Sequence, residues 1–389
     1  FFKEQVMELY VHVPFCKRKC RYCDFASWAG REDWMPAYVD AVLTEAHSAH
    51  DALGAQSMET AFLGGGTPSL LPPEELTRLL RGVFSLFPLE ADAEFTSECN
   101  PGTLTAAWLE AAQAAGVNRL SMGMQAGQPH LLNMLGRIHT FTDVEASVKL
   151  ARAAGIRNLN LDLMFGLPGQ TLNDWAETLD MALSLRPEHL SCYGLIPEAG
   201  TQLGDAILAG EVPLPAEDAE RAMYDMTLTR LAAAGFEQYE ISNFAKPGCA
   251  CRHNLGYWRQ TPYLGLGPAA ASMLPGRTPE EFSLRRTNVR DLAAYLRQGQ
   301  QGRFQPAEEE SVSPAEARFE TMMLGLRTTK GVNEATFEAM HGVALADVYG
   351  AKLAELETQG LVCHTGGWWR LTRRGMDVQN GVLVELMEG

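Results

Sequence analysis

A short junction occurs three times in this chain and limits the folds available to it. It consists of an alanine-rich helical run, a glycine, and a run of strand-forming residues, and its glycines are Gly116, Gly155 and Gly235. Because glycine takes the left-handed backbone conformation beyond a helix end without a Cβ penalty, each junction predicts a helix that ends and a strand that follows. Helices that alternate with strands indicate βαβ units around a parallel sheet.

Six strand-forming runs extend this pattern through the first half of the chain. They cover residues 9–13, 60–63, 94–98, 119–122, 159–164 and 190–195. Thr142 and Glu145 form a capping box, which predicts the start of the helix that ends at Gly155. Six βα units fit a partial or full barrel, and a doubly wound sheet is the competing layout. Hydrophobic periodicity does not choose between them.

The composition changes after this α/β region. Gly, Pro, Gln and charged residues are frequent between 262 and 310, which predicts a linker with one helix near 288–298. Ser313, Pro314 and Glu316 then supply an N-cap, a first-turn proline and a capping glutamate, so a new domain is expected to begin there. The expected division is a barrel domain over 1–275, a linker over 276–312 and a C-terminal domain over 313–389.

The C-terminal domain is expected to be helical and to resemble a winged helix. Helices are predicted near 314–326, 334–340 and 346–358, and Gly366 with Gly367 marks the turn of a small hairpin after them. Winged helices are often used to bind DNA, but the formal net charge of −16 argues against a broad surface that contacts phosphates. We therefore expect no nucleic-acid partner.

Length and hydrophobicity indicate a folded protein without a membrane span. A chain of 389 residues with 46% hydrophobic content can build one large α/β domain and a smaller one. No run of 18 apolar residues occurs, and the first five residues have neither the charged nor the apolar region of a signal peptide. We expect a soluble, cytoplasmic protein, and transient association with a membrane stays open.

Three of the eight cysteines crowd into one loop directly after the first predicted strand. Cys16, Cys20 and Cys23 form a Cys-x3-Cys-x2-Cys run. Three thiolates on one loop can bind three irons of a 4Fe-4S cluster and leave the fourth iron open to another ligand. A zinc site that also uses His12, or a set of buried thiols, is the alternative. Zinc ligands usually come as two separated pairs, which favours the cluster.

The cysteine run resembles that of the radical-SAM superfamily, in which S-adenosylmethionine (SAM) binds the open iron. A glycine run, Gly64, Gly65 and Gly66, precedes Thr67 at the end of the second strand. Glycines let a backbone approach a ligand closely, which suits the zwitterionic methionine end of SAM. A glycine run alone is equally compatible with a tight turn. Its place next to the cysteine strand favours the ligand.

From Leu9 onward the chain resembles the HemN/HemW branch of this superfamily, and the resemblance covers both domains. It implies SAM contacts at Tyr10, Tyr22, Gly65, Gly66, Thr67, Glu98, Gln125, Arg137, Asp162, Gly194 and Ala271. Carboxylates can hold ribose hydroxyls, and an arginine can bind a carboxylate through two hydrogen bonds. Each polar residue alone is better explained as a loop cap or a surface charge. Their recurrence at strand ends, where parallel barrels place active sites, favours the SAM contacts.

Within this branch the residues after Cys23 distinguish two functions. The oxygen-independent coproporphyrinogen III oxidases carry a further cysteine two positions after the third ligand, whereas Asp24 and Phe25 follow here. The Cys-Asp-Phe form resembles the heme chaperones of the branch. The short stretch before the first strand also leads us to expect that the N-terminal extension of the oxidases is absent.

A second motif resembles the heme-associated His-Asn-x-x-Tyr-Trp sequence of the chaperones. It contains His253, Tyr257 and Trp258, and Cys251 lies just before it. An imidazole or a thiolate can ligate heme iron, and aromatic rings can supply an apolar wall, so Cys251, His253 and Tyr257 are the predicted heme contacts. The alternative is that His253 and Trp258 form a hydrogen-bonded core pair in a loop that closes the barrel. Both interpretations stay open.

These observations predict a heme chaperone that binds a 4Fe-4S cluster, SAM and heme as cargo, and delivers the heme to client hemoproteins. The alternative is a radical-SAM decarboxylase of porphyrinogen propionates, and a methyltransferase or ring-opening enzyme acting on heme is a weaker third class. No catalytic residue is assigned.

Overall fold

The structure is a computed structural model that describes residues 7–278 and 280–387. The first six residues, on which the expected lack of a signal peptide rests, lie outside the described residues. So do residues 388 and 389, at the end of the expected C-terminal domain. Within the described ranges, no helix combines the length and the apolar character needed to cross a bilayer.

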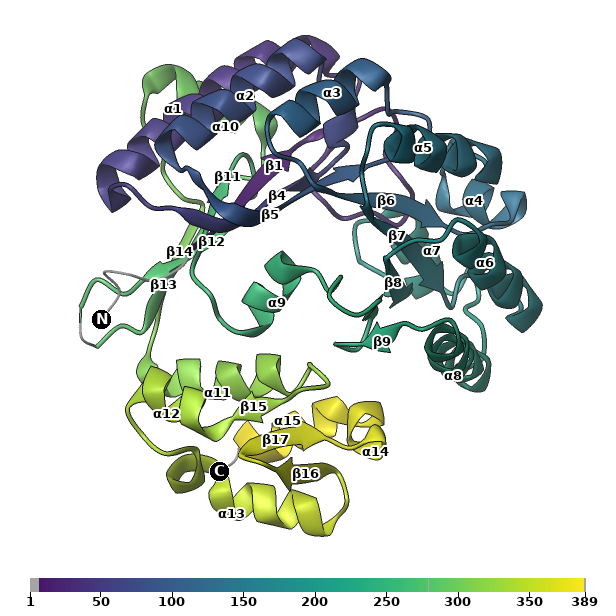
Figure 1. Ribbon diagram of the computed structural model, residues 1–389, viewed down its shortest axis with the longest axis vertical. Helices are drawn as coiled ribbons and strands as arrows, with labels where there is room; N and C mark the ends of the chain where they lie inside the picture. Colours follow the sequence, from purple (N-terminus) through teal and green to yellow (C-terminus); the bar gives the residue numbers. More distant parts are fainter. Residues whose placement is uncertain (1–6, 279, 388–389) are drawn as a thin grey trace.

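A curved parallel sheet forms the centre of the molecule (Figure 1). All six predicted strands are present and pair in sequence order: β1 (Met7–Val13), β4 (Met58–Gly65), β5 (Leu89–Cys99), β6 (Arg119–Gln125), β7 (Asn158–Phe165) and β8 (His189–Gly194). Each new strand joins the same edge, so right-handed crossovers place the connecting helices on one face. In a doubly wound sheet the strand order would instead reverse partway, and helices would lie on both faces. The fold is therefore a partial (β/α)6 barrel.

The connecting helices cover the convex face of this sheet (Figure 1). They are α1 (Met35–Leu53), α2 (Pro73–Leu86), α3 (Ala106–Ala114), α5 (Phe141–Ala153), α6 (Leu172–Ser184) and α8 (Glu217–Ala233). The short helices α4 (Pro129–Leu135) and α7 (Gln202–Leu208) lie instead beside the loop that carries the three cysteines, where Leu135 and Leu203 form backbone hydrogen bonds with Arg21. The three predicted junction glycines all have positive φ, 101° at Gly116, 95° at Gly155 and 81° at Gly235. The repeated junction thus ends α3, α5 and α8 as the sequence predicts.

The start of α5 differs from the prediction. The capping box is formed by Thr140 and Asp143, two residues before the predicted pair of Thr142 and Glu145. The backbone N–H of Thr140 donates to the Asp143 carboxylate at 2.7 Å. Two overlapping Thr-x-x-acid patterns occur here, and this one begins the helix so that Val144 and Val148 face the core.

The stretch 276–312 is more than the linker that its composition suggests. It contains the expected helix as α10 (Leu292–Gln301), together with β13 (Ser283–Thr287) and β14 (Glu308–Val312). These strands extend the sheet beyond β11 (Tyr263–Leu266) and β12 (Ala271–Pro275), which continue from β1. The outer strands carry paired charges, such as Arg286 with Glu309 at 2.8 Å. Edge strands often carry charged residues, so a search for hydrophobic runs does not detect them.

Helix α9 (Arg252–Trp258) lies on the concave side of the sheet (Figure 1). It approaches β1 so closely at Gly256 that a Cβ there would lie 1.9 Å from a carboxylate oxygen of Glu8. Glu8 is 2% exposed, and one of its oxygens has no hydrogen-bond partner. Burial raises the pKa of Glu8 to about 9, so this carboxyl is neutral in the folded protein near pH 7.

The C-terminal domain has its own apolar core, which includes Met322, Phe337 and Leu353. Its elements are α11 (Pro314–Gly325), β15 (Val332–Asn333), α12 (Glu334–His341), α13 (Leu345–Thr358), β16 (Val362–Thr365), β17 (Trp368–Leu371), α14 (Arg373–Asp377) and α15 (Gln379–Met387). Ser313 and Glu316 form the predicted capping box. Three helices followed by a hairpin agree with the expected winged-helix-like module.

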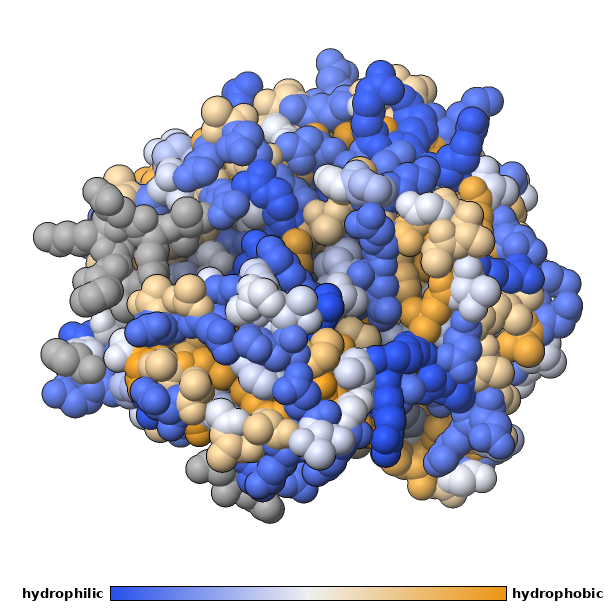
Figure 2. Space-filling model, turned by 60° about the horizontal axis from the view of Figure 1, so that its bottom comes forward, coloured by the Kyte–Doolittle hydropathy of each residue, from blue (hydrophilic) through white to orange (hydrophobic). Residues whose placement is uncertain are grey.

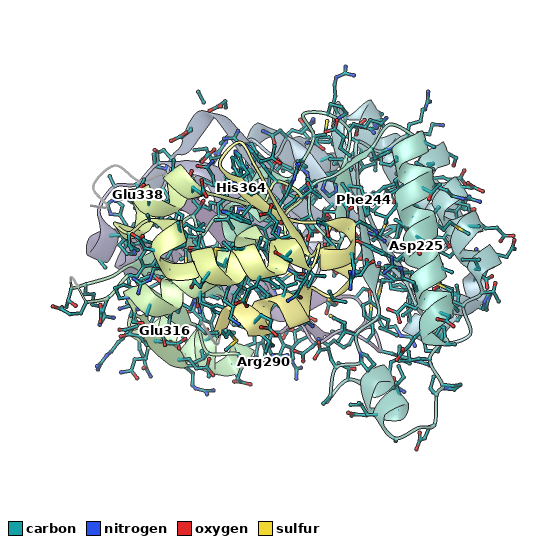
Figure 3. The ribbon with its side chains drawn as sticks, turned by 90° about the horizontal axis from the view of Figure 1, so that it is seen from below. Asp225, Phe244, Arg290, Glu316, Glu338 and His364 are labelled. Atoms are coloured by element: carbon teal, nitrogen blue, oxygen red, sulfur yellow. The ribbon has the colours of Figure 1, made fainter. Side chains whose placement is uncertain are left out.

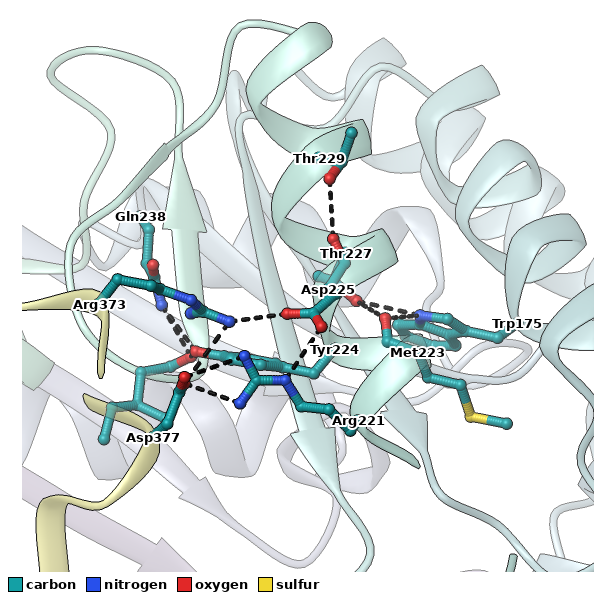
Figure 4. A network of polar contacts seen from close by, with 11 residues as sticks. Trp175, Arg221, Met223, Tyr224, Asp225, Thr227, Thr229, Gln238, Arg373 and Asp377 are labelled. Carbon is teal, nitrogen blue, oxygen red and sulfur yellow. Dashed lines mark hydrogen bonds and ion pairs between the residues drawn. The ribbon is translucent and has the colours of Figure 1, made fainter. Parts of the chain in front are cut away.

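This domain lies across the open side of the barrel, beside the helix that carries Asp225 (Figure 3). Hydrophilic residues interrupt the hydrophobic ones on the face turned forward in Figure 2. Four charged side chains join α14 to α8 (Figure 4). Arg221 contacts Asp377 at 2.8 Å, and Arg373 contacts Asp225 at the same distance while its guanidinium lies 5.2 Å from the ring of Tyr224.

A second attachment joins the domain to the concave side of the barrel. Arg327 pairs with Glu240, which is fully buried, at 2.8 Å and lies 4.8 Å from the ring of Trp258 in α9. One arginine therefore links the C-terminal domain, the edge of the sheet and the helix inside the barrel.

We predict that Glu8→Gln stabilises the protein increasingly as the pH rises. The folded state holds a proton on Glu8 that the unfolded chain releases above about pH 4.5, so the free energy of unfolding falls between that pH and about 9. The substitution removes this loss, which is on the order of a few kcal/mol at pH 8. Thermal unfolding at pH 5 and pH 8 measures it, with Glu110→Gln on the exposed face of α3 as the control. An equal gain in Tm at both pH values would contradict the prediction.

Candidate functional site

A cavity of about 930 Å³ lies at the carboxyl ends of β4 to β7. It is lined by most of the residues that the sequence analysis assigned to cluster and SAM: Cys16, Cys20, Tyr22, Cys23, Gly65, Gly66, Thr67, Glu98, Gln125, Arg137 and Asp162. The carboxyl ends of neighbouring parallel strands meet at one edge of a sheet, so residues far apart in sequence converge there.

The cysteine loop is fixed to the surrounding structure by its backbone. The N–H of Arg21 donates to the carbonyl of Leu135 at 3.0 Å, and the N–H of Trp28 donates to the carbonyl of Pro14 at 2.8 Å. All three thiols of the loop are free, and each is partly exposed to the cavity. The loop therefore presents its three sulfurs on one wall.

The arrangement of these thiols fits a cluster better than a single ion. Across residues 7–278 and 280–387, no three His, Cys, Asp or Glu side chains are close enough to bind one metal ion. A cubane cluster does not require the three sulfurs to meet at one point, because each thiolate binds a different iron. His12, the fourth ligand of the zinc alternative, has both ring nitrogens engaged, with Tyr10 Oη at 2.9 Å and the carbonyl of Ala26 at 2.8 Å.

The glycine run packs against the cysteine loop. The N–H groups of Gly66 and Thr67 donate to the carbonyls of Val13 and Phe15, both at 2.7 Å. Gly65 has a φ of 103°, and a Cβ there would lie 2.4 Å from the ring of His12. The sequence analysis attributed the glycines to a ligand. In the structure they are also required by the protein itself, because any side chain would push the strand end away from the loop.

Two half-buried carboxylates, Glu98 and Asp162, line the cavity. Glu98 accepts a hydrogen bond from the N–H of Gly65 at 2.8 Å, and burial together with the charge of Asp162 raises the pKa of Glu98 to about 7. Asp162 accepts hydrogen bonds from Ser121 at 3.1 Å and Asn160 at 2.7 Å. Burial raises the pKa of Asp162, and these hydrogen bonds oppose the shift. Both carboxylates can therefore accept hydrogen bonds from hydroxyl groups of a ligand.

Gln125 and Arg137 occupy special backbone positions beside these carboxylates. Gln125 is 8% exposed and has a φ of 66°, next to a register shift between β6 and β7. A non-glycine residue in this conformation costs about 1–3 kcal/mol, and such residues concentrate at functional sites. Arg137 follows Gly136, the left-handed C-cap of α4, which directs its guanidinium toward Cys20.

The sequence analysis missed several residues of the cavity wall. Asn100, Ser121, Gly123 and His139 line it together with the assigned residues. Asn100 carried a signal, because it follows Glu98 at a strand end and begins an Asn-Pro-Gly turn. The position of His139 depends on where α4 ends, and this cannot be read from a local pattern. Its pKa is lowered to about 4, chiefly by burial and then by Arg137.

Three predicted SAM contacts are placed elsewhere. The Tyr10 hydroxyl bonds to His12, and its ring stacks on Phe62 with centroids 6.2 Å apart. Gly194 lines a separate hollow with Tyr224. Ala271 lies exposed on β12. Contacts of these residues with SAM stay predictions.

The predicted heme contacts lie together inside the barrel, in a closed network. His253 is 0% exposed, and its ring nitrogens contact Thr60 Oγ1 at 2.7 Å and the Tyr257 hydroxyl at 2.9 Å. The thiol of Cys251 donates to Glu94 at 3.3 Å. Burial, followed by the charge of Arg119, lowers the pKa of His253 to about 3, so the ring is neutral. The ring is buried, as the packing interpretation expects, but its partners are Thr60 and Tyr257 rather than Trp258, whose Nε1 has no hydrogen-bond partner among the described residues. The heme role stays a prediction.

Comparisons with known proteins agree with this architecture. Residues 10–182 match the radical SAM superfamily, and residues 312–378 match the HemN C-terminal domain. The crystal structure of Escherichia coli coproporphyrinogen III oxidase, HemN, covers 98% of this chain and 90% of its own with a TM-score of 0.83, at 23% identity, so it shares the fold. The barrel is thus that of a radical SAM protein.

Two curated relatives define the family more narrowly. The chain is 36% identical to the heme chaperone HemW of Bacillus subtilis, across 96% of this chain and 97% of the relative. It is 37% identical to the heme chaperone HemW of Escherichia coli, across 97% of each. The chain belongs to the HemW family.

We predict that Gly65→Ala destabilises the protein by on the order of 2–5 kcal/mol, because it adds both backbone strain and a clash with His12. Gly169→Ala is the matched control, since its φ of 75° is similarly strained but no atom lies within 4 Å of the added Cβ. It should cost about 1–2 kcal/mol. Urea unfolding measures both free energies. Equal losses would show that close packing against His12 does not limit the residue at position 65.

Proposed function

We propose that this protein is a heme chaperone that binds a 4Fe-4S cluster and SAM at the barrel mouth and delivers heme to client hemoproteins. The observation that carries the proposal is the similarity, over nearly the whole chain, to proteins named heme chaperone HemW. The convergence of the cysteine loop, the glycine run and the two carboxylates in one cavity supports the cofactor part of the proposal.

The cavity residues can be given separate tasks. Cys16, Cys20 and Cys23 hold the cluster, which supplies single electrons to SAM when both are bound. The glycine run borders the place next to the cysteines, where the methionine end of SAM fits. Glu98 and Asp162 can accept hydrogen bonds from ribose hydroxyls. Because the pKa of Glu98 is near 7, a ligand that donates a hydrogen bond to it favours its ionised form.

Heme could reach the ring of His253 only if part of the barrel moved, whereas the three cysteines already face an open cavity. Cys251, His253 and Tyr257 are the heme contacts expected from the sequence, but the ring of His253 is hydrogen-bonded through both nitrogens. Ligation of iron by this ring therefore requires α9 to leave β4. This movement would leave the Thr60 hydroxyl buried without a hydrogen-bond partner, which costs free energy and opposes the movement.

We expect His253→Ala to lower the melting temperature and to leave the heme Soret band unchanged. Loss of the ring removes two buried hydrogen bonds and the stacking on Phe62, whereas a ring that stays inside the barrel contributes nothing to bound heme. Heme titration of the wild type and the variant, followed by absorbance, measures the band. A shifted or weakened band would instead establish His253 as a heme ligand and show that α9 opens.

The second candidate function is oxygen-independent coproporphyrinogen oxidation, because the fold of Escherichia coli HemN extends over 98% of this chain. Anaerobic incubation with SAM, a reductant and coproporphyrinogen, followed by mass spectrometry, separates the two functions. We expect no decarboxylated product above the level of a variant in which Cys16, Cys20 and Cys23 are all alanine. Successive losses of CO2 that need the three cysteines would replace the chaperone proposal.

A further inference from the structure

Two of the three loop thiols accept hydrogen bonds from side chains that share one partner. Thr67 Oγ1 donates to Cys16 Sγ at 3.6 Å, and Arg137 Nη1 donates to Cys20 Sγ at 3.6 Å. Thr67 follows β4 and Arg137 follows α4, so they come from different parts of the barrel. Asn100 joins them, since its Nδ2 donates to Thr67 Oγ1 at 2.7 Å and its Oδ1 accepts from Arg137 Nη2 at 2.6 Å.

A tight turn fixes the position of Asn100. Its carbonyl accepts from the N–H of Thr103 at 3.1 Å and from Thr103 Oγ1 at 2.6 Å. Pro101 and Gly102, with a φ of 78° at the glycine, supply the two central residues of a type II turn. The hydroxyls of Thr103 and Ser69 are 2.5 Å apart, which connects this turn to the one that follows the glycine run. These hydrogen bonds therefore hold the backbone of Asn100 in place.

The hydrogen-bond directions make the amide of Asn100 specific. A threonine hydroxyl has one proton, and because Asn100 donates to the Thr67 oxygen, that proton stays available for Cys16. The amide oxygen at the same time holds one nitrogen of Arg137, whose position is also fixed by the carbonyl of Gly123 at 2.6 Å. An aspartate could accept from Arg137 but could not donate to Thr67. A leucine could do neither.

Neither donor belongs to the cysteine loop. The direction of both hydrogen bonds to sulfur thus depends on Asn100, the residue directly after β5, which also lines the cavity. Hydrogen bonds to cluster sulfurs, and positive charge near them, stabilise the more negative reduced cluster and raise its reduction potential.

We propose that Asn100 is a positioning residue that aims the Thr67 hydroxyl and the Arg137 guanidinium at two of the three thiolates and so sets the reduction potential of the cluster. The inference rests on the proposed function only for the presence of a cluster. It assigns to Asn100 a task that does not require contact with SAM or heme.

The test compares the wild-type full chain with Asn100→Leu and Asn100→Asp. Each protein is reconstituted anaerobically, its iron and sulfide are quantified, and the cluster is titrated with reductant, without SAM, while the reduced state is followed by electron paramagnetic resonance. For Asn100→Leu we expect at least a tenfold lower ratio of reduced to oxidised cluster at a given potential, which is a shift of about 59 mV for one electron. Asn100→Asp should shift further in the same direction, because it adds a negative charge.

Asn118→Leu is the matched control. Asn118 also braces β5, because it donates to the carbonyl of Ala93 at 2.8 Å and accepts from the N–H of Phe95 at 3.0 Å, but it contacts neither donor to sulfur. We expect its cluster to titrate as in the wild type, even if the melting temperature falls. A shift as large as that of Asn100→Leu would show that the effect comes from β5 as a whole, and would overturn the assignment to Asn100.

The remaining outcomes are also decisive. Wild-type potentials in both Asn100 variants, at full iron content, overturn this inference and leave the proposed function intact. A wild type that holds no iron overturns both. If Asn100→Leu fails to hold iron, the nearly isosteric Asn100→Asp decides, since it keeps the size of the side chain and the contact with Arg137.

Discussion

The cavity depends on the contact between the end of β4 and the cysteine loop that follows β1. The backbone N–H groups of Gly66 and Thr67 bond to the carbonyls of Val13 and Phe15, and the ring of His12 fills the space that a side chain at Gly65 would occupy. Backbone hydrogen bonds hold their partners at a fixed distance, so the sulfurs keep a defined position relative to the strand ends. The carboxylates, Gln125 and Arg137 are then arranged around a loop that is already in place.

Burial decides which charges this barrel can hold. Glu8 and Glu98 have raised pKa values, and His253 has a lowered one, because each loses contact with water. Inside the barrel α9 closes the concave side with neutral, hydrogen-bonded groups. At the mouth the pKa of Glu98, raised to about 7, leaves this carboxyl partly protonated at neutral pH in the absence of a ligand. Burial thus keeps the groups inside the barrel uncharged. At the mouth it leaves Glu98 with a pKa at which a ligand can change its charge.

Local patterns in the sequence were sufficient for the strands, the cysteine loop and the residues at strand ends. The glycine junctions were confirmed, because a positive φ is a local requirement. The cysteine and glycine motifs could be recognised because each lies in one short segment; the structure brings them into one cavity, and their ligands stay predictions. The capping box of α5 was placed two residues late, since overlapping patterns differ only in the packing of Val144 and Val148. The strands within 276–312 were missed because edge strands tolerate charge.

The site residues that escaped the sequence analysis depend on distant contacts. Asn100 matters because its turn meets Ser69, and no spacing rule connects these positions. Tyr10, Gly194 and Ala271 came from the resemblance alone, and the structure places them outside the cavity wall. The sequence analysis paired His253 with Trp258, whereas its partners are Thr60 and Tyr257, because the contacts of a ring inside a packed barrel cannot be read from a local motif.

The two attachments of the C-terminal domain differ in how they respond to salt. The arginines and aspartates between α8 and α14 are largely half-exposed, so dissolved ions screen their attraction over about 8 Å at physiological ionic strength. Glu240 has no exposed surface, and its pairing with Arg327 is screened much less. Rising ionic strength therefore weakens the contact between α8 and α14 before it weakens the pair of Arg327 and Glu240. The attachment that persists is the one that also contacts Trp258 in α9.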